Sequence, residues 1–245
     1  MENRIIGELL VKHLELFGRL AADDRDALLG VRGEVVSLER GDDVLKVRGP
    51  PSHSVVVIEG LLQRYRVNPD GQRQIHSIYI PSDAPCLEAL PMDYMDSSLG
   101  ALVPSKVGVV PRGEMFRIMD ARPNVLTLIW RETLVQAAIN REWLMRNSQP
   151  PPHTRLAHFL CEITSRARAA GLDHRGAFDL PLVDEDLGDA LALSQRDLAR
   201  TVKVLHATGA VRFQAGKVTV KDWRQLTDIA EFDDSYLHLP RRQAA

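Results

Sequence analysis

The stretch from Asp184 to Phe213 constrains the chain most, because it joins two short helical patterns through a tight break at Ala192–Leu193. Ser194 opens the second pattern and Asp197 follows three residues later. This spacing is a variant of the capping box, which ties up backbone N–H groups at a helix start. Gly209 supplies a residue suited to the left-handed conformation that ends helices. The stretch therefore predicts two helices joined by a very short turn.

The second helical pattern is amphipathic. Its apolar residues Leu198, Val202 and Leu205 fall at i, i+4 and i+7, which is one face of a helix. The opposite face carries Gln195, Arg196, Ala199, Arg200 and Lys203. A helix-turn-helix needs this division, because its second helix packs inward and reads a major groove outward. A plain helical hairpin with a solvated basic face fits this stretch equally well.

Composition and local charge narrow the class of partner. The 245 residues allow two modest domains, and 44% hydrophobic with 26% charged residues is ordinary for a globular protein. The net charge of −2 points to no partner, but residues 195–224 hold seven Lys and Arg against two Asp. One basic surface on a nearly neutral protein suits nucleic acid.

Other classes of protein find little support in the sequence. Cys86 and Cys161 are too few for a disulfide framework or a four-cysteine metal site. The chain shows no signal-peptide pattern and no apolar run long enough for a bilayer, so we expect a cytoplasmic protein that does not enter a membrane. The eight histidines are scattered, and neither metalloprotease, hydrolase nor Walker motifs occur. We therefore expect no catalysis, no metal and no cofactor.

The N-terminal part reads as two helices, residues 5–20 and 23–29, followed by short strands. These strands are rich in β-branched residues and alternate with glycine-bearing turns, which is typical of an all-β sandwich or barrel-like roll. The expected strands are residues 35–38, 44–47, 54–59, 61–67, 74–80, 99–103 and 106–110.

A long helix and a second, mostly helical region follow. Pro123 suits the first position of a helix over residues 124–146, which is too long to be buried on one side only. The run Gln149-Pro150-Pro151-Pro152 ends it. Beyond a helix over 153–169 and the opening stretch, Gln214–Gly216 is flanked by strands, as in a wing. Asp222 is expected to cap a last helix, and the tail residues Phe232, Tyr236, Leu237 and Leu239 are expected to dock on the body.

This order of elements resembles the Crp/Fnr family of bacterial transcription regulators over nearly the whole chain. LERGDDVLKVRGPPSHSVVVIEGLLQRYRVNPDGQRQIHSIYIPSD resembles the family's cyclic-nucleotide-binding-type roll, and SQRDLARTVKVLHATGAVRF its recognition helix and first wing strand. The resemblance implies an α+β fold with three parts: a β-roll over 1–120, a dimerisation helix over 121–149 and a winged helix-turn-helix over 150–245.

The resemblance also assigns DNA contacts. The family's base-reading positions fall on Gln195, Arg196 and Arg200, with Ala199 between them, and Arg suits guanine as Gln suits adenine. Many members carry Arg or Glu at the first two reading positions, so the usual half-site is not assumed here. Further contacts are expected from Ser194, Thr201 and Lys203 to phosphates, and from Arg212 and Lys217 of the wing to the DNA backbone. A salt bridge within the domain is the alternative for the wing pair.

The effector pocket implied by the resemblance departs from the family pattern. It corresponds to Cys86, Leu87 and Glu88 with Ser97 and Ser98, where nucleotide-binding members supply an arginine for the phosphate. No arginine lies between Arg73 and Arg112, so cyclic AMP is not expected as the effector, which stays unknown. An N-terminal iron–sulfur cluster lacks its cysteines. His76 and Cys86 remain as haem ligands to consider, and Cys86 as a redox sensor.

The family further implies a homodimer formed through the long helix. The residues expected in this contact are Val125, Leu128, Ile129, Glu132, Val135, Gln136 and Ile139. The resulting hypothesis is a transcription regulator that binds a near-palindromic operator in double-stranded DNA, and contacts RNA polymerase if it is an activator. A regulator active without any ligand is one alternative. A small-molecule-binding module whose helix-turn-helix contacts protein is the other.

Overall fold

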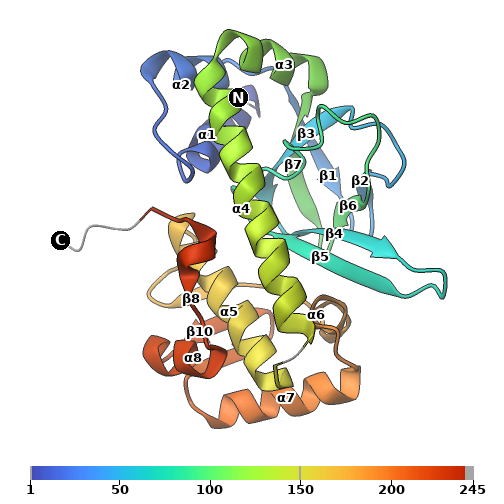
Figure 1. Cartoon of the computed structure of the whole chain (residues 1–245), viewed down its shortest axis with the longest axis vertical. Helices are drawn as coiled ribbons and strands as arrows, with labels where there is room; N and C mark the ends of the chain where they lie inside the picture. Colours follow the sequence, from blue (N-terminus) through green and yellow to red (C-terminus); the bar gives the residue numbers. More distant parts are fainter. Residues whose placement is uncertain (1, 149, 241–245) are drawn as a thin grey trace. The chain divides into compact units, whose positions relative to one another are not determined.

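The computed structural model describes residues 2–148 and 150–240, which form two compact units (Figure 1). The first unit holds residues 2–66 and 77–137 with Pro240, and the second holds residues 67–76 and 138–239. Helix α4 (Pro123–Ser148) contributes its first half to one unit and its last turns to the other. The division into parts at residues 120 and 149 stays a prediction.

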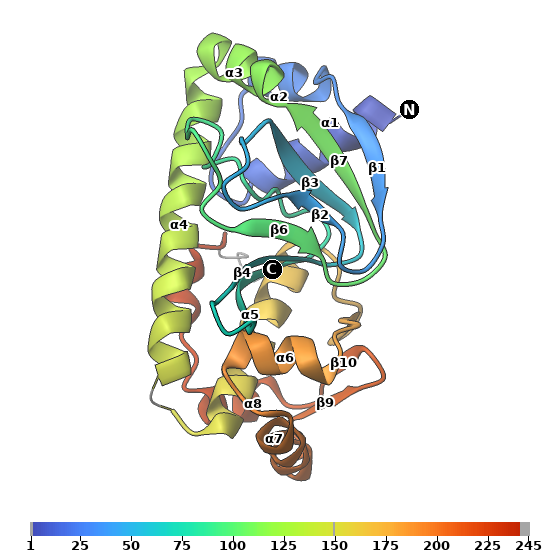
Figure 2. The same ribbon diagram turned by 90° about the vertical axis from the view of Figure 1, so that its right-hand side faces the viewer.

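The first unit is built on antiparallel sheets with strand orders β1-β7-β3 and β2-β6-β4-β5 (Figure 2). In β3, Val55 and Val57 pack into the interior of the roll, whereas Val56 joins the core under the helices. Both faces of this strand are thus buried, which explains its unbroken apolar sequence. The strands are β1 (Glu34–Leu38), β2 (Asp43–Leu45), β3 (His53–Glu59), β4 (Leu62–Val67), β5 (Arg73–Tyr79), β6 (Ser98–Ala101) and β7 (Ser105–Pro111), of which the β4–β5 hairpin end, residues 67–76, belongs to the second unit.

Helices α1 (Glu2–Leu14), α2 (Ala22–Leu29) and α3 (Arg112–Ala121) complete the first unit. Helix α1 packs on the β1-β7-β3 sheet. Gly108 of β7 permits this close approach, because a Cβ there would lie 2.6 Å from Cγ1 of Ile6. The predicted roll with flanking helices is confirmed, but the first helix ends at Leu14 and not at residue 20.

Helix α4 begins at Pro123, as predicted. The structure corrects the predicted dimer face, because nearly all of it is buried inside the chain. Oε1 of Glu132 lies 3.6 Å from Nε2 of His13 in α1. Gln136 is the one residue of the predicted face that is half-buried and not buried. The buried members of the predicted face are Val125, Leu128, Ile129, Glu132, Val135 and Ile139.

The solvent-facing side of α4 carries a second apolar row. Leu126, Trp130 and Leu134 are spaced four residues apart and are 50%, 65% and 55% exposed. Residues at this spacing share one face of a helix. We call these three residues the outer stripe.

The second unit contains an antiparallel sheet in the order β8-β10-β9 and a group of helices packed on α5. Leu156, Phe159, Leu160 and Ile163 of α5 are buried, as the spacing predicted. The elements are α5 (Pro152–Ala169), β8 (Ala177–Asp179), α6 (Asp184–Leu191), α7 (Gln195–Ala207), β9 (Val211–Gln214), β10 (Lys217–Val220), α8 (Trp223–Ala230) and the 3₁₀ helix η1 (Asp234–Leu237). Within the described residues, no helix is long and apolar enough to cross a membrane.

Candidate nucleic-acid interface

The turn between α6 and α7 is as tight as the sequence predicted. Ala192 takes the left-handed conformation with φ 52° and ψ 47°, and the Leu193 N–H donates to the Gly188 carbonyl at 3.0 Å. A larger residue does not fit at Gly188, because a Cβ there would lie 2.9 Å from the Leu193 carbonyl oxygen. Ser194 Oγ accepts from the Asp197 N–H at 3.1 Å, which confirms the predicted cap of α7.

Helix α7 packs one face inward and leaves its polar face in solvent. Leu198 and Leu205 are buried, as predicted. The structure corrects the assignment of Thr201 to a phosphate contact. Thr201 is 4% exposed, and its hydroxyl donates to the Asp197 carbonyl at 2.7 Å, so this residue belongs to the packed face. The predicted contact residues that are exposed are Ser194, Gln195, Arg196, Ala199, Arg200 and Lys203, and Asp197 and Val204 are exposed beside them.

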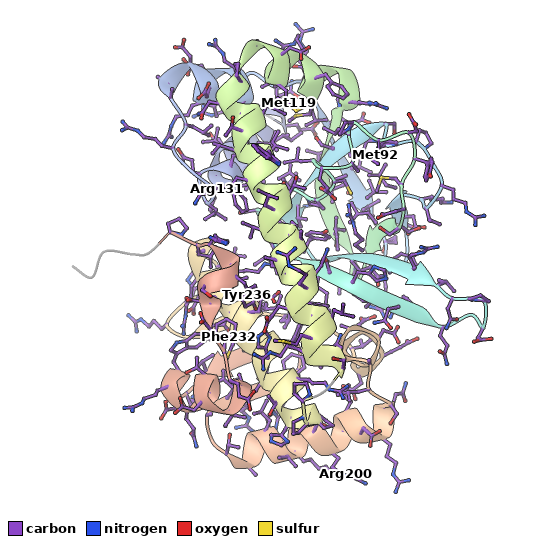
Figure 3. All side chains as sticks on the ribbon, in the orientation of Figure 1. Met92, Met119, Arg131, Arg200, Phe232 and Tyr236 are labelled. Carbon is purple, nitrogen blue, oxygen red and sulfur yellow. The ribbon has the colours of Figure 1, made fainter. Side chains whose placement is uncertain are left out.

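Arg200 projects from α7 away from the body of the second unit (Figure 3). Ser194 is less available than the others, because its hydroxyl donates to Asp197 Oδ2 at 2.7 Å while it caps the helix. The outward face therefore offers two guanidinium groups, one amide and one ammonium group on a rigid helix. Such groups can donate hydrogen bonds to base edges and neutralise phosphates.

The predicted wing is a hairpin of β9 and β10 whose turn places Ala215 and Gly216 at positive φ. Arg212 and Lys217 are exposed, and Arg212 Nε donates to Gln214 Oε1 at 3.0 Å. His206 of α7 ties helix and wing together, because its Nε2 accepts from the Phe213 N–H at 3.0 Å. Sequence reasoning missed His206, whose partner is seven residues away and outside the helix.

Helix α6 is held by residues that the sequence did not single out. Arg73, at the β4–β5 hairpin, pairs through Nη2 with the buried Asp186 and through Nε with Asp189, both at 2.7 Å. Gln74 donates to the Asp189 carbonyl at 3.0 Å, and Asn147 to the Ala190 carbonyl at 2.9 Å. These donors satisfy carbonyls that the end of a helix leaves open.

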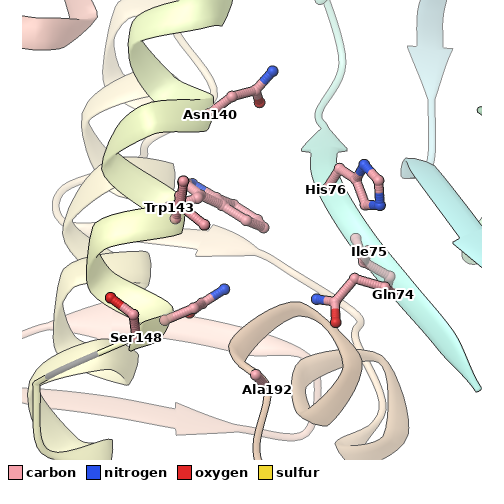
Figure 4. Close-up of a pocket in the computed structure, with 9 residues that line it drawn as sticks. Gln74, Ile75, His76, Asn140, Trp143, Ser148 and Ala192 are labelled. Carbon is pink, nitrogen blue, oxygen red and sulfur yellow. The ribbon is translucent and has the colours of Figure 1, made fainter. Parts of the chain in front are cut away.

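A cavity of about 420 Å³ lies beside these contacts within the second unit (Figure 4). His76, considered above as a haem ligand, is part of its wall. The wall is formed by Gln74, Ile75, His76, Asn140, Trp143, Leu144, Asn147, Ser148 and Ala192.

The predicted effector positions of the β-roll have partners within the protein. Arg64 of β4 places Nη2 2.6 Å from Glu88 Oε1 and 3.0 Å from Cys86 Sγ. The arginine that reaches this turn is Arg64, which precedes the arginine-free segment between Arg73 and Arg112. Ser98 Oγ accepts from the Val47 N–H at 3.1 Å, and Ser97 donates to Asp96 at 2.7 Å. Their role in effector binding stays a prediction.

Cys86 does not have the properties of a redox sensor. Its thiol is buried, and burial raises its pKa to about 12, although the charge of Arg64 opposes this. The reactive form of cysteine is the thiolate, so a thiol held protonated near neutral pH reacts slowly. Leu87, next to it, is also buried in the core.

Comparison with known proteins adds independent findings. A family model described as a Crp-like helix-turn-helix domain matches residues 154–229. The transcriptional activator protein FnrL of Cereibacter sphaeroides is 24% identical over 241 residues, 96% of this chain and 94% of that protein. The transcriptional activator protein anr of Pseudomonas aeruginosa is 21% identical over 212 residues, 86% of each. These relatives are regulators rather than enzymes.

A solved structure shares the fold. FixK2 from Bradyrhizobium japonicum superposes with a TM-score of 0.73 at 22% identity, covering 81% of this chain and 98% of that one. Its likeness extends over most of this chain, beyond the helix-turn-helix that the family model matches.

Proposed function

Since the chain belongs to the Crp/Fnr family of transcription regulators, we propose that its α7 reads the major groove and that two copies together bind a near-palindromic operator. The observation that carries this proposal is the outward face of α7, where Gln195, Arg196, Arg200 and Lys203 are exposed on a helix whose start is fixed by its cap. The outer stripe of α4 supports the dimer, because a second copy can cover these apolar side chains.

Arg200→Ala tests the reading helix. The operator is first isolated with the native protein by selection of bound DNA from a random pool. An arginine that contacts a base contributes about 1–3 kcal/mol of discrimination, so operator affinity should fall roughly tenfold to a hundredfold while non-specific affinity changes much less. Binding is measured by fluorescence anisotropy on the operator and on scrambled DNA.

The matched control is Arg19→Ala, which removes an exposed arginine from the first unit. It should bind the operator as the native chain does. Equal operator affinity for the native and Arg200→Ala proteins would show that α7 does not read DNA in this way. A helix-turn-helix that contacts protein instead would also lack the steep loss of DNA affinity with rising salt.

We further propose that cyclic AMP is not the effector. The side chains of Arg64 and Glu88 are 15% and 22% exposed and already form an ion pair. A cyclic phosphate placed on Arg64 would displace Glu88 and leave a partly buried carboxylate without its cation, which is unfavourable. Isothermal titration with cyclic AMP should therefore show no binding in the micromolar range, and a micromolar dissociation constant would contradict the proposal. The ion pair also favours a regulator that works without a ligand.

A further inference from the structure

The chain continues beyond α8 and returns to the last turns of α4. Helix α8 ends at Ala230, Glu231 takes a left-handed conformation, and η1 follows with Leu237 buried. The family model ends at residue 229, so this segment lies outside the part of the chain that it matches. We call residues 231–239 the strap.

The strap meets α4 and α5 at one buried carboxylate. Glu162 of α5 is 0% exposed, and its Oε2 accepts from Trp143 Nε1 of α4 and from the Tyr236 hydroxyl, each at 2.9 Å. Arg166 adds a weaker contact to Oε1 at 3.4 Å. Burial raises the pKa of Glu162, which these donors oppose. A carboxylate so deeply buried depends on such donors, so the strap completes its environment.

Aromatic rings add to the contact between the strap and α5, and Figure 3 labels two of them, Phe232 and Tyr236. His158 of α5 stacks on Tyr236 with ring centroids 6.0 Å apart and meets the edge of Phe232 at 5.2 Å. Burial, reinforced by the charge of Arg146, lowers the pKa of His158 to about 4, so the ring is neutral near pH 7. Neutral rings at these distances pack favourably.

The start of the strap is attached to α4 directly. Arg146 places Nη1 3.3 Å from Glu231 Oε2 and donates through Nη2 to the Glu231 carbonyl at 3.1 Å. Trp143 and Arg146 lie three residues apart and thus on one side of α4. The strap therefore contacts the last turns of α4 directly through Glu231 and indirectly through Glu162, which accepts from both Tyr236 and Trp143. These contacts add to the proline-rich connection between α4 and α5.

We infer that the strap fixes the last turns of α4 against α5, and so sets the orientation in which α4 carries the reading helix α7. This rests on the proposed function, in which α4 joins two copies and α7 reads one half-site in each. Tyr236 and Glu162 then act as positioning residues. They touch no DNA, but they determine which separation of half-sites the dimer accepts.

The experiment compares the native chain with Tyr236→Phe and with a chain ending at Ala230. Operators with half-sites moved apart or together by one or two base pairs are tested beside a single half-site. The native dimer should prefer one separation sharply. Both variants should accept several separations and bind the best operator about tenfold more weakly, because a loosely held second domain has a lower effective concentration. Their affinity for the single half-site should stay unchanged.

The controls are Tyr94→Phe, which removes an exposed phenolic hydroxyl in the first unit, and a chain ending at Leu239, which keeps the strap. Both should behave as the native protein. A strap that serves only stability would instead lower half-site and full-site affinity together with the melting temperature and leave the preferred separation sharp, which would overturn the inference.

Hydrogen exchange provides a readout that needs no DNA. In both variants, amide exchange over residues 138–148 should become faster than in the native chain. Unchanged exchange in residues 138–148 would contradict the inferred role of the strap, even if neither variant bound DNA. Conversely, faster exchange in a protein that binds no operator would support the strap while contradicting the proposed function.

Discussion

Replacing Trp130 and Leu134 together by glutamate is expected to convert the proposed dimer to monomers and to lower affinity for the two-half-site operator at least about a hundredfold. The outer stripe is the apolar row of α4 that the chain itself leaves in solvent. Four carboxylates in a two-fold interface would be desolvated without partners, which costs several kcal/mol. A monomer also loses the gain from binding two linked half-sites.

Sedimentation velocity measures the first effect and anisotropy on the operator the second. The double variant should remain folded, because both side chains are exposed in the single chain. Met92→Glu is the matched control, since it places the same charge on an exposed apolar position outside α4 and should remain dimeric. A double variant that still sediments as a dimer would place the contact between copies elsewhere.

The predicted dimer face illustrates what the sequence could and could not establish. The helical limits of α4 followed from Pro123 and from the proline run after Ser148. Which face is buried did not follow, because α4 has two apolar rows. The choice is made by α1 and the β-roll, which cover Val125, Leu128 and Ile129 from distant parts of the chain.

Local interactions were predicted well for a related reason. The caps by Ser194 and Asp222 each join residues three apart, and the turn at Ala192 lies within the sequence window that defines it. In contrast, the pairs Arg64–Glu88 and Glu162–Tyr236 join residues far apart in sequence. No spacing rule connects such residues, so their contacts appear only once the fold brings the elements together.

The outward face of α7 was predicted correctly only in part. Its periodicity identified Arg196, Arg200 and Lys203 as exposed, and the structure agrees. Thr201 was misassigned when the family resemblance was used to place DNA contacts along this helix. Its position three residues after Leu198 places it on the packed side, where its hydroxyl is satisfied by the helix backbone.

Gly188→Val should disrupt the turn on which the position of α7 depends. The new Cβ would lie 2.9 Å from the Leu193 carbonyl oxygen, which is a backbone atom and cannot rotate away. Relief requires α6 to move from the turn, which opens the Leu193 N–H to Gly188 carbonyl bond and shifts Ser194, the cap of α7. Crowding of this kind costs about 1–3 kcal/mol. Helix propensity does not explain such a loss, because valine is a somewhat better helix former than glycine.

Urea unfolding followed by circular dichroism should therefore show a less stable second unit, and operator affinity should fall by at least about tenfold because α7 is displaced at its reading end. Gly113→Val separates crowding from propensity. Gly113 also lies within a helix, but a Cβ there would have no neighbouring atom within 4 Å, so Gly113→Val changes helix propensity without crowding and should not lose stability. If both variants lost the same stability and Gly188→Val still bound the operator normally, the close approach of Gly188 to Leu193 would not be what positions α7.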